Sequence, residues 1–267
     1  MRKAIGGADV MLERMNYVWR LIGTGLAFTF FGLGGIFMTV FVFTSIALFT
    51  RDETTRIRRV RKTIYYAFRV FVYLLRVGGI IDSRFHDTER LQNVRGALIV
   101  ANHPSLLDTV FLMSRMPDVQ CIVKHELWDN VYLGGVMRAA GYIRNDGDAE
   151  KMMAQCEKTL KNGQNILVFP EGTRSVPGQA LKFQRGFANI AMHFSAPIQL
   201  VTIICKPSTL TKGSPWYAIP SRQARFDITF NEQLDMADYL RHEPRSLKVR
   251  KLTRELEQYY IGKLCNE

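Results

Sequence analysis

The distribution of hydrophobic residues differs sharply between the first third of the chain and the remainder. From Leu21 to Thr50, thirty consecutive residues carry no charge, and Phe, Leu, Ile and Val dominate. A helix of this length would extend about 45 Å, which exceeds the hydrocarbon core of a bilayer at about 30 Å. The pattern predicts a membrane helix over 21–50, with a bend at the glycines of 32–35. A buried core helix is the alternative.

A second apolar stretch, 63–81, is interrupted by Arg69 and Arg76. These arginines and Lys62 recur every seven residues, so they share one face of a helix, and the large apolar side chains lie away from that face. The pattern is typical of an amphipathic helix in the membrane interface with its cations at the headgroups. The alternative is a second spanning helix, in which a central arginine costs about 2.5–3.5 kcal/mol.

Beyond residue 83, short apolar runs alternate with helical patterns, which predicts an α/β domain. We expect a mixed, largely parallel sheet flanked by helices, with an N-terminal helical membrane anchor. Strands are expected at 97–100, 165–169, 198–205 and 225–230, and helices near 105–116, 148–162, 184–194 and 244–264. The predicted anchor occupies 1–82, as an apolar helix (21–50), a basic run (51–62) and an amphipathic helix (63–81), and the α/β domain occupies 83–267.

Positive charge is concentrated beside the predicted membrane helix. The chain of 267 residues has a net charge of +12, of which +8 lies in residues 1–80. The basic run 51–62 directly follows the apolar helix, which favours contact with anionic headgroups on the cytoplasmic side of the cell inner membrane. Nucleic-acid binding would explain the charge but not its position, so no nucleic-acid partner is expected.

The four cysteines are far apart, with no C-x-x-C pair and no neighbouring histidine cluster: Cys121, Cys156, Cys205 and Cys265. This spacing predicts neither a disulfide framework nor a metal site.

Polar residues follow directly after the first predicted strand, in the order Asn102-His103-Pro104-Ser105-Leu106-Leu107-Asp108. Pro104 and Ser105 suit the opening of a helix, with Asp108 about one turn inside it. Its carboxylate could then fold back toward His103. A carboxylate that orients a histidine creates a general base. The alternative is a purely structural contact.

The second predicted strand ends in Phe169-Pro170-Glu171-Gly172-Thr173-Arg174-Ser175. Gly172 permits close approach of a ligand to the backbone, and Thr173 and Arg174 offer a hydroxyl and a guanidinium to a phosphate. The alternative is a turn held by a salt bridge between Arg174 and Glu171.

Taken together, an N-H-x4-D motif followed by F-P-E-G-T-R-S closely resembles the glycerolipid acyltransferases, the family of 1-acylglycerol-3-phosphate acyltransferases. The resemblance extends from about residue 99 to 204. It includes Lys124-His125-Glu126-Leu127, Gly141-Tyr142-Ile143-Arg144, residues 183–186 and Pro197.

The resemblance implies a membrane-bound enzyme that moves an acyl chain from acyl-CoA or acyl carrier protein to a lysolipid hydroxyl, with 1-acylglycerol-3-phosphate as the first candidate. His103 is then the general base and Asp108 its partner, and no metal or organic cofactor is required. The implied acceptor and phosphate site comprises Glu171, Gly172, Thr173, Arg174 and Arg144.

Two departures from the family pattern leave other functions open. The Gly141–Arg144 stretch is short, and Leu200 replaces the second of two prolines of which Pro197 is the first. These regions shape the acceptor site, so the same chemistry on a lipid that is not a phosphoglyceride is one alternative. A catalytically silent, membrane-tethered lipid-binding protein is another, although it would have no need of a base. Hydrolysis of the thioester by water is a third.

Overall fold

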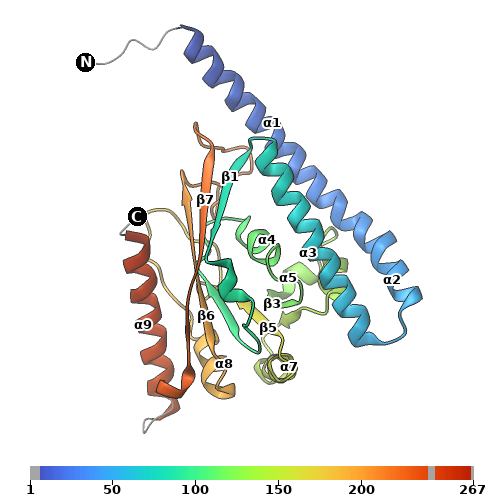
Figure 1. The fold of residues 1–267 in the computed structure, drawn as a ribbon, viewed down its shortest axis with the longest axis vertical. Helices are drawn as coiled ribbons and strands as arrows, with labels where there is room; N and C mark the ends of the chain where they lie inside the picture. The colour runs from blue at the N-terminus through green and yellow to red at the C-terminus, as the bar shows by residue number, and fades with distance from the viewer. Residues whose placement is uncertain (1–6, 240–243, 266–267) are drawn as a thin grey trace.

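Within the part of the chain that the computed structural model describes, residues 7–239 and 244–265, seven strands form one sheet with helices on both faces (Figure 1). The strand order is β1-β7-β6-β2-β5-β3-β4. The strands are β1 (Ile81–His86), β2 (Leu98–Ala101), β3 (Val119–Lys124), β4 (Ile143–Asn145), β5 (Asn165–Val168), β6 (Ile198–Lys206) and β7 (Ala224–Leu234).

The sheet is mixed and largely parallel, which confirms the expected fold class. Strands β6, β2, β5, β3 and β4 run parallel, whereas β7 is antiparallel to β6 and β1 is parallel to β7. The sequence pattern did not reveal β1, β3 and β4. The edge strand β1 is mostly polar, Gln120 interrupts the apolar run of β3, and β4 has only three residues.

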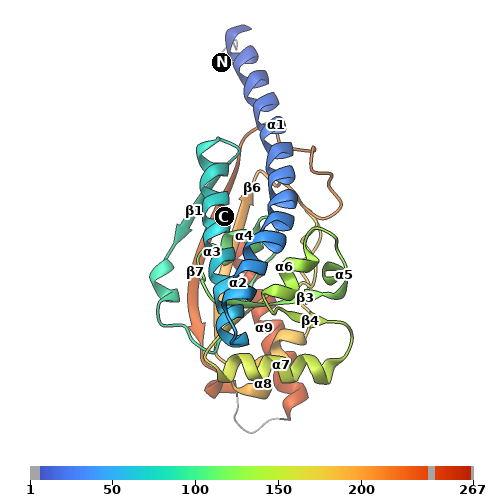
Figure 2. The ribbon, with the colours of Figure 1, turned by 90° about the vertical axis from the view of Figure 1, so that its right-hand side faces the viewer.

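Two layers of helices cover the sheet (Figure 1, Figure 2). One face carries the helices of the first half of the chain, and the other carries α7, α8 and α9, as the two hydrophobic clusters show. The helical elements are α1 (Gly7–Phe37), η1 (Met38–Phe43), α2 (Thr44–Phe49), α3 (Glu53–Val77), η2 (Thr88–Leu91), α4 (Asp108–Met113), α5 (His125–Trp128), α6 (Gly134–Ala139), α7 (Ala149–Lys161), α8 (Gly186–Phe194), η3 (Met236–Tyr239) and α9 (Arg245–Cys265).

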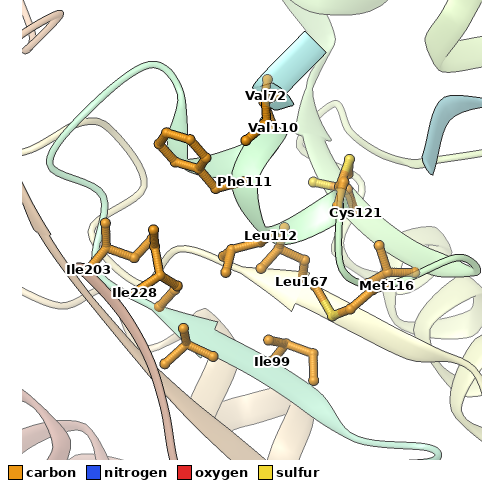
Figure 3. Packing of buried hydrophobic residues seen from close by; sticks show 14 of the residues in the cluster. Val72, Ile99, Val110, Phe111, Leu112, Met116, Cys121, Leu167, Ile203 and Ile228 are labelled. Atoms are coloured by element: carbon orange, nitrogen blue, oxygen red, sulfur yellow. The ribbon is translucent and has the colours of Figure 1, made fainter. Parts of the chain in front are cut away.

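The central strand β2 is buried on both faces, which explains why its sequence is an uninterrupted apolar run. Ile99 belongs to the cluster under α3 and α4, which also contains Phe111 and Val72 (Figure 3). Leu98 and Val100 belong to the cluster on the opposite face. The position of β2 is thus determined from both sides of the sheet.

The predicted apolar helix is continuous from α1 through η1 to α2, and its irregular part lies at η1, a π-helical turn, not at the glycines of 32–35. Gly35 serves a different purpose. A Cβ atom at this position would lie 2.9 Å from the carbonyl oxygen of Tyr132, so glycine permits close contact with the loop before α6.

One side of α1 packs along the domain and the other side is exposed. Trp19 donates a hydrogen bond of 2.7 Å from Nε1 to the carbonyl oxygen of Gly78. The buried Arg20 side chain donates to the carbonyl oxygens of Pro220 and Ser221. By length and composition, the segment Asp9–Phe49 could cross a membrane.

Helix α3 includes both the basic run and the predicted amphipathic helix, so the expected boundary at residue 63 is wrong. Asp52 caps its start by accepting a hydrogen bond from the backbone N–H of Thr55, and the helix ends before Gly78. The expectation that its apolar face meets lipid is also wrong for Ile64 and Phe71, which are buried against the protein. Both side chains pack in the hydrophobic core between α3 and the sheet.

Arg61 departs from the headgroup contact predicted for the basic run. Its side chain is buried and forms an ion pair of 3.1 Å with Asp118. Nε also donates a hydrogen bond to the carbonyl oxygen of Ala140 at 2.8 Å. A buried arginine needs such partners, so Arg61 fastens α3 to the turn after α6.

Candidate active site

The parallel pairing of β2 with β5 brings the two polar strand ends together. Val100 and Val168 are register partners, so the chain leaves both strands at the same edge of the sheet. The two loops are then joined directly, because the backbone N–H of Ser175 donates a hydrogen bond of 2.7 Å to the carbonyl oxygen of His103. The side-chain amide of Asn102 both donates to and accepts from the backbone of Ile203 on β6.

His103 and Asp108 form the contact that the spacing predicted. The distance from His103 Nδ1 to Asp108 Oδ2 is 2.8 Å, and the same oxygen accepts a hydrogen bond of 2.7 Å from the backbone N–H of Ser105. Asp108 is the first residue of α4 and not one turn inside it, so the 104–107 turn carries the carboxylate back toward the imidazole. The Phe169 ring stacks on His103 with centroids 4.0 Å apart. Nε2 is therefore the ring nitrogen left for a substrate proton.

Burial controls the ionisation of Asp108. The carboxyl is completely buried, and this raises its pKa from 3.8 to about 6, against the hydrogen bonds from His103 and Ser105, which lower it. In the part of the chain that is described, Asp108 Oδ1 has no hydrogen-bond partner. The carboxyl is thus held through one oxygen, Oδ2, by His103 and the backbone of Ser105, in a site that disfavours its charge.

Glu171 joins the two loops through both of its carboxylate oxygens. Oε1 accepts a hydrogen bond of 2.7 Å from the backbone N–H of His103, and Oε2 accepts one of 2.7 Å from the hydroxyl of Ser175. Both oxygens are engaged, so a place for this carboxylate in the acceptor-binding set, as the resemblance implied, has no support in these contacts. The geometry makes Glu171 a positioning residue for the backbone of His103.

Arg174 binds a third loop. Nη1 donates hydrogen bonds to the carbonyl oxygens of Leu210 and Thr211 at 2.9 and 3.1 Å. Among the ion pairs of residues 7–239 and 244–265, none joins Arg174 to Glu171, so the salt bridge considered from the sequence does not form. One nitrogen of the guanidinium holds the β6–β7 loop, which leaves Nε and Nη2 for a ligand.

A cavity of about 2160 Å³ connects this polar centre with the N-terminal helices. His103, Gly172, Thr173 and Arg174 line one part of it, while apolar side chains of α1, α3 and α6 line the rest. Lys124, at the end of β3, also lines the cavity. Sequence reasoning did not assign it a role, although its place at a strand end, in the segment Lys124-His125-Glu126-Leu127, was a usable signal.

Arg144 is set apart from the other predicted site residues. Arg144 is not one of the described residues that line the cavity. Its guanidinium lies 5.9 Å from the ring centroid of Trp128, and its Nε lies 3.8 Å from a carboxylate oxygen of Asp146. The structure therefore brings together His103, Asp108, Gly172, Thr173 and Arg174, and leaves Arg144 outside the cavity.

Comparison with known proteins identifies this part of the chain. The family model described as Acyltransferase matches residues 82–206, the segment from β1 to the end of β6. Over residues 82–206, the chain is similar to the glycerolipid acyltransferase family. Both loops of the site lie within these residues.

Curated relatives agree with this domain but extend beyond the match. A 1-acyl-sn-glycerol-3-phosphate acyltransferase of Helicobacter pylori is 34% identical over 113 residues, which are 40% of this chain and 48% of that protein. A lyso-ornithine lipid O-acyltransferase of Rhodobacter capsulatus is 26% identical, covering 60% of this chain and 65% of that protein. The chain thus spans about half to two thirds of the length of these relatives.

A solved structure has the same fold as this chain. The crystal structure of the 1-acyl-sn-glycerophosphate (LPA) acyltransferase PlsC from Thermotoga maritima superposes with a TM-score of 0.67 at 22% identity. The superposition covers 90% of this chain and 97% of that one, so it includes the N-terminal helices as well as the sheet.

The raised pKa of Asp108 predicts an unusual pH dependence of stability. Because the folded-state pKa of about 6 lies above the ordinary value of 3.8, this carboxyl contributes stability that is fully present below pH 3.8 and is lost as the pH rises through 6. We expect the melting temperature of Asp108→Asn to rise relative to that of the wild type between pH 4.5 and 7.5. A difference in melting temperature that is constant with pH would contradict this electrostatic account.

Proposed function

We propose that this protein transfers an acyl chain from acyl-CoA or acyl carrier protein to the free hydroxyl of a lysolipid, and that 1-acylglycerol-3-phosphate is the acceptor. The hydrogen bond between His103 and the buried Asp108, at the mouth of a cavity with one polar and one apolar part, carries the proposal. An acyl thioester and a lysolipid are both amphiphiles and match such a cavity.

In the proposed mechanism, His103 acts as the general base. Nε2 takes the proton from the acceptor hydroxyl while Asp108 stabilises the resulting imidazolium. The acceptor oxygen forms a bond to the thioester carbonyl carbon, and the bond from that carbon to sulfur then breaks. The leaving thiolate takes the proton from His103. A thiol has a pKa of about 8.5, so its thiolate is a good leaving group without a strong acid.

Three residues are proposed to hold the acceptor's phosphate. Gly172 lines the cavity with a positive φ of 67°, a conformation that favours glycine, and Thr173 and Arg174 follow it directly. Arg174 has Nε and Nη2 free of the loop carbonyls that its Nη1 holds. Lys124, which lines the cavity, is proposed as a second cation for the phosphate. The family resemblance implied this role for Arg144.

A lipid acceptor without a glycerol phosphate is the second candidate. The relative from Rhodobacter capsulatus, described as a lyso-ornithine lipid O-acyltransferase, aligns with more of this chain than the relative from Helicobacter pylori does. Leu200, at the position where the family pattern carries a proline, distinguishes this chain in the region that shapes the acceptor site.

We further propose that residues 1–82 attach residues 83–267 to the membrane, as an anchor that also shares its core. Large apolar side chains along the outer side of α1 and η1 are exposed, including Ile22 at 52% and Phe41 at 60%. Because the opposite side of the helix packs on the domain, one face of it would contact lipid, not its whole circumference. The charge asymmetry supports the cytoplasmic side of the inner membrane.

Loss of the base should abolish transfer without unfolding the protein. We expect His103→Ala to have no measurable acyl transfer, Asp108→Asn to lose most of it, and both to retain vesicle binding and a wild-type-like circular dichroism spectrum. The assay incubates purified protein with a panel of lysolipids and both donor types and follows acyl incorporation by mass spectrometry. Near-normal turnover of His103→Ala would refute the mechanism, and release of free fatty acid and thiol alone would identify a thioesterase.

The phosphate assignment predicts a selective defect in Arg174→Lys. Two parallel hydrogen bonds from a guanidinium to a phosphate are lost, so the acceptor KM should rise about 10- to 100-fold while the donor KM changes little. The exposed Arg185→Lys is the matched control and should change neither constant. Equal losses toward both substrates, with a lowered melting temperature, would show that Arg174 only holds the β6–β7 loop.

The membrane proposal predicts that charges on the outer face of the N-terminal helix release the protein. Ile22→Asp combined with Phe41→Asp should reduce flotation with phospholipid vesicles while the melting temperature in detergent stays unchanged, because both side chains are exposed. Leu247→Asp, at an exposed position on α9, is the control and should float normally. Normal flotation of the double variant would exclude this face as the lipid contact.

A further inference from the structure

Three arginines from two neighbouring helical segments meet on the surface outside the catalytic cavity. Arg69 and Arg76 belong to α3, and Arg115 directly follows α4, which lies beside α3 (Figure 1). Arg115 lies close to α3 because α4 packs on that helix, and burial, together with the charges of Arg69 and Arg76, lowers the pKa of Arg115. None of the three is among the described residues that line the cavity at His103.

No Asp or Glu among the described residues forms an ion pair with these three arginines. Helix α3 contains no Asp or Glu after Glu53. The Nε atom of Arg115 is buried and lacks a hydrogen-bond partner among the described residues. Like charges that converge without a carboxylate repel one another, and an anion from outside would relieve that repulsion.

Aromatic contacts hold two of the arginines in place. The guanidinium carbon of Arg115 lies 3.8 Å from the ring centroid of Phe85 on β1, a stacked geometry that restricts its orientation. Arg69 lies over the Tyr65 ring at 5.2 Å and donates a hydrogen bond to its hydroxyl. Arg76 is exposed and one helical repeat away from Arg69, so it can reach the same ligand.

An exposed apolar strip runs along α3 beside these arginines. Tyr73, Leu74 and Val77 are each at least half exposed, and none of them is among the described residues that line the catalytic cavity. By helical geometry, the strip lies between the arginine edge of α3 and the side that meets α1, where Phe71 packs on Phe30 and Phe31. Cations that border an apolar surface are arranged as they would be at the boundary between lipid headgroups and acyl chains.

We propose that Arg69, Arg76 and Arg115 form a binding site for the phosphate group of an anionic membrane phospholipid, separate from the catalytic cavity. The guanidinium groups bind the phosphate through charge-assisted hydrogen bonds, and the neighbouring strip on α3 contacts the acyl chains of the same lipid. The site rests on the proposed membrane contact and adds a headgroup preference to it. It would determine how α3 is rotated about its axis at the bilayer surface.

The test compares lipid affinities of the full-length protein in a neutral detergent by native mass spectrometry. Phosphatidylglycerol and phosphatidylcholine are titrated against the wild type and against Arg69→Gln combined with Arg76→Gln, which leaves the Phe85 stack intact. At roughly fivefold per lost cation, the phosphatidylglycerol affinity of the double variant should fall about 25-fold, toward that for phosphatidylcholine. Arg250→Gln combined with Arg254→Gln, exposed on α9 across the sheet, removes the same charge and should change the affinity less than about twofold.

Several outcomes would overturn the proposal. Equal phosphatidylglycerol affinity in the wild type and the Arg69/Arg76 variant would exclude the site, and so would an equal loss in the α9 control. Competition by inorganic phosphate at the same concentration as the lipid would show that the site binds free phosphate and no membrane lipid. Acyl transfer in detergent should be unchanged in both variants. A wild type that binds phosphatidylglycerol selectively but transfers no acyl chain would therefore refute the proposed function alone.

Discussion

The site depends on the parallel pairing of β2 with β5 at the centre of the sheet. Two strands that run in the same direction end at the same edge, so the loops after Ala101 and Val168 must share one small volume. Glu171 holds the two loops in a defined geometry. One of its carboxylate oxygens accepts a hydrogen bond from the backbone N–H of His103, and the other accepts one from the Ser175 hydroxyl. The imidazole, its Asp108 partner and the Gly172–Arg174 turn all take their places from this junction.

Function and stability oppose each other at Asp108. A buried carboxylate without a full set of partners destabilises the folded state, and its raised pKa is the sign of that cost. The same burial keeps water away from the hydrogen bond to His103, which strengthens the electrostatic support for an imidazolium. A carboxyl that is costly for folding is consistent with the proposed role of Asp108 in catalysis.

The N-terminal helices belong to the domain as much as to the proposed membrane contact. The inner side of α3 supplies Ile64, Phe71 and Leu75 to the core under the sheet, and residues of α1 and α3 also line the cavity that contains His103. An acyl chain in that cavity would lie next to helices whose outer sides are apolar and exposed. Substrate entry from the bilayer would then require no crossing of bulk water.

The sequence by itself determined the α/β class, four of the seven strands, the His103–Asp108 contact and the apolar N-terminal helix, because each is encoded in local periodicity or in a short spacing. It could not reveal β1, β3 and β4, whose residues become strands only through their neighbours in the sheet. Only the tertiary structure placed Lys124 at the cavity, removed Arg144 from it, and buried Arg61 against Asp118. These outcomes depend on how helices and strands pack against one another in three dimensions, which the local sequence pattern does not encode.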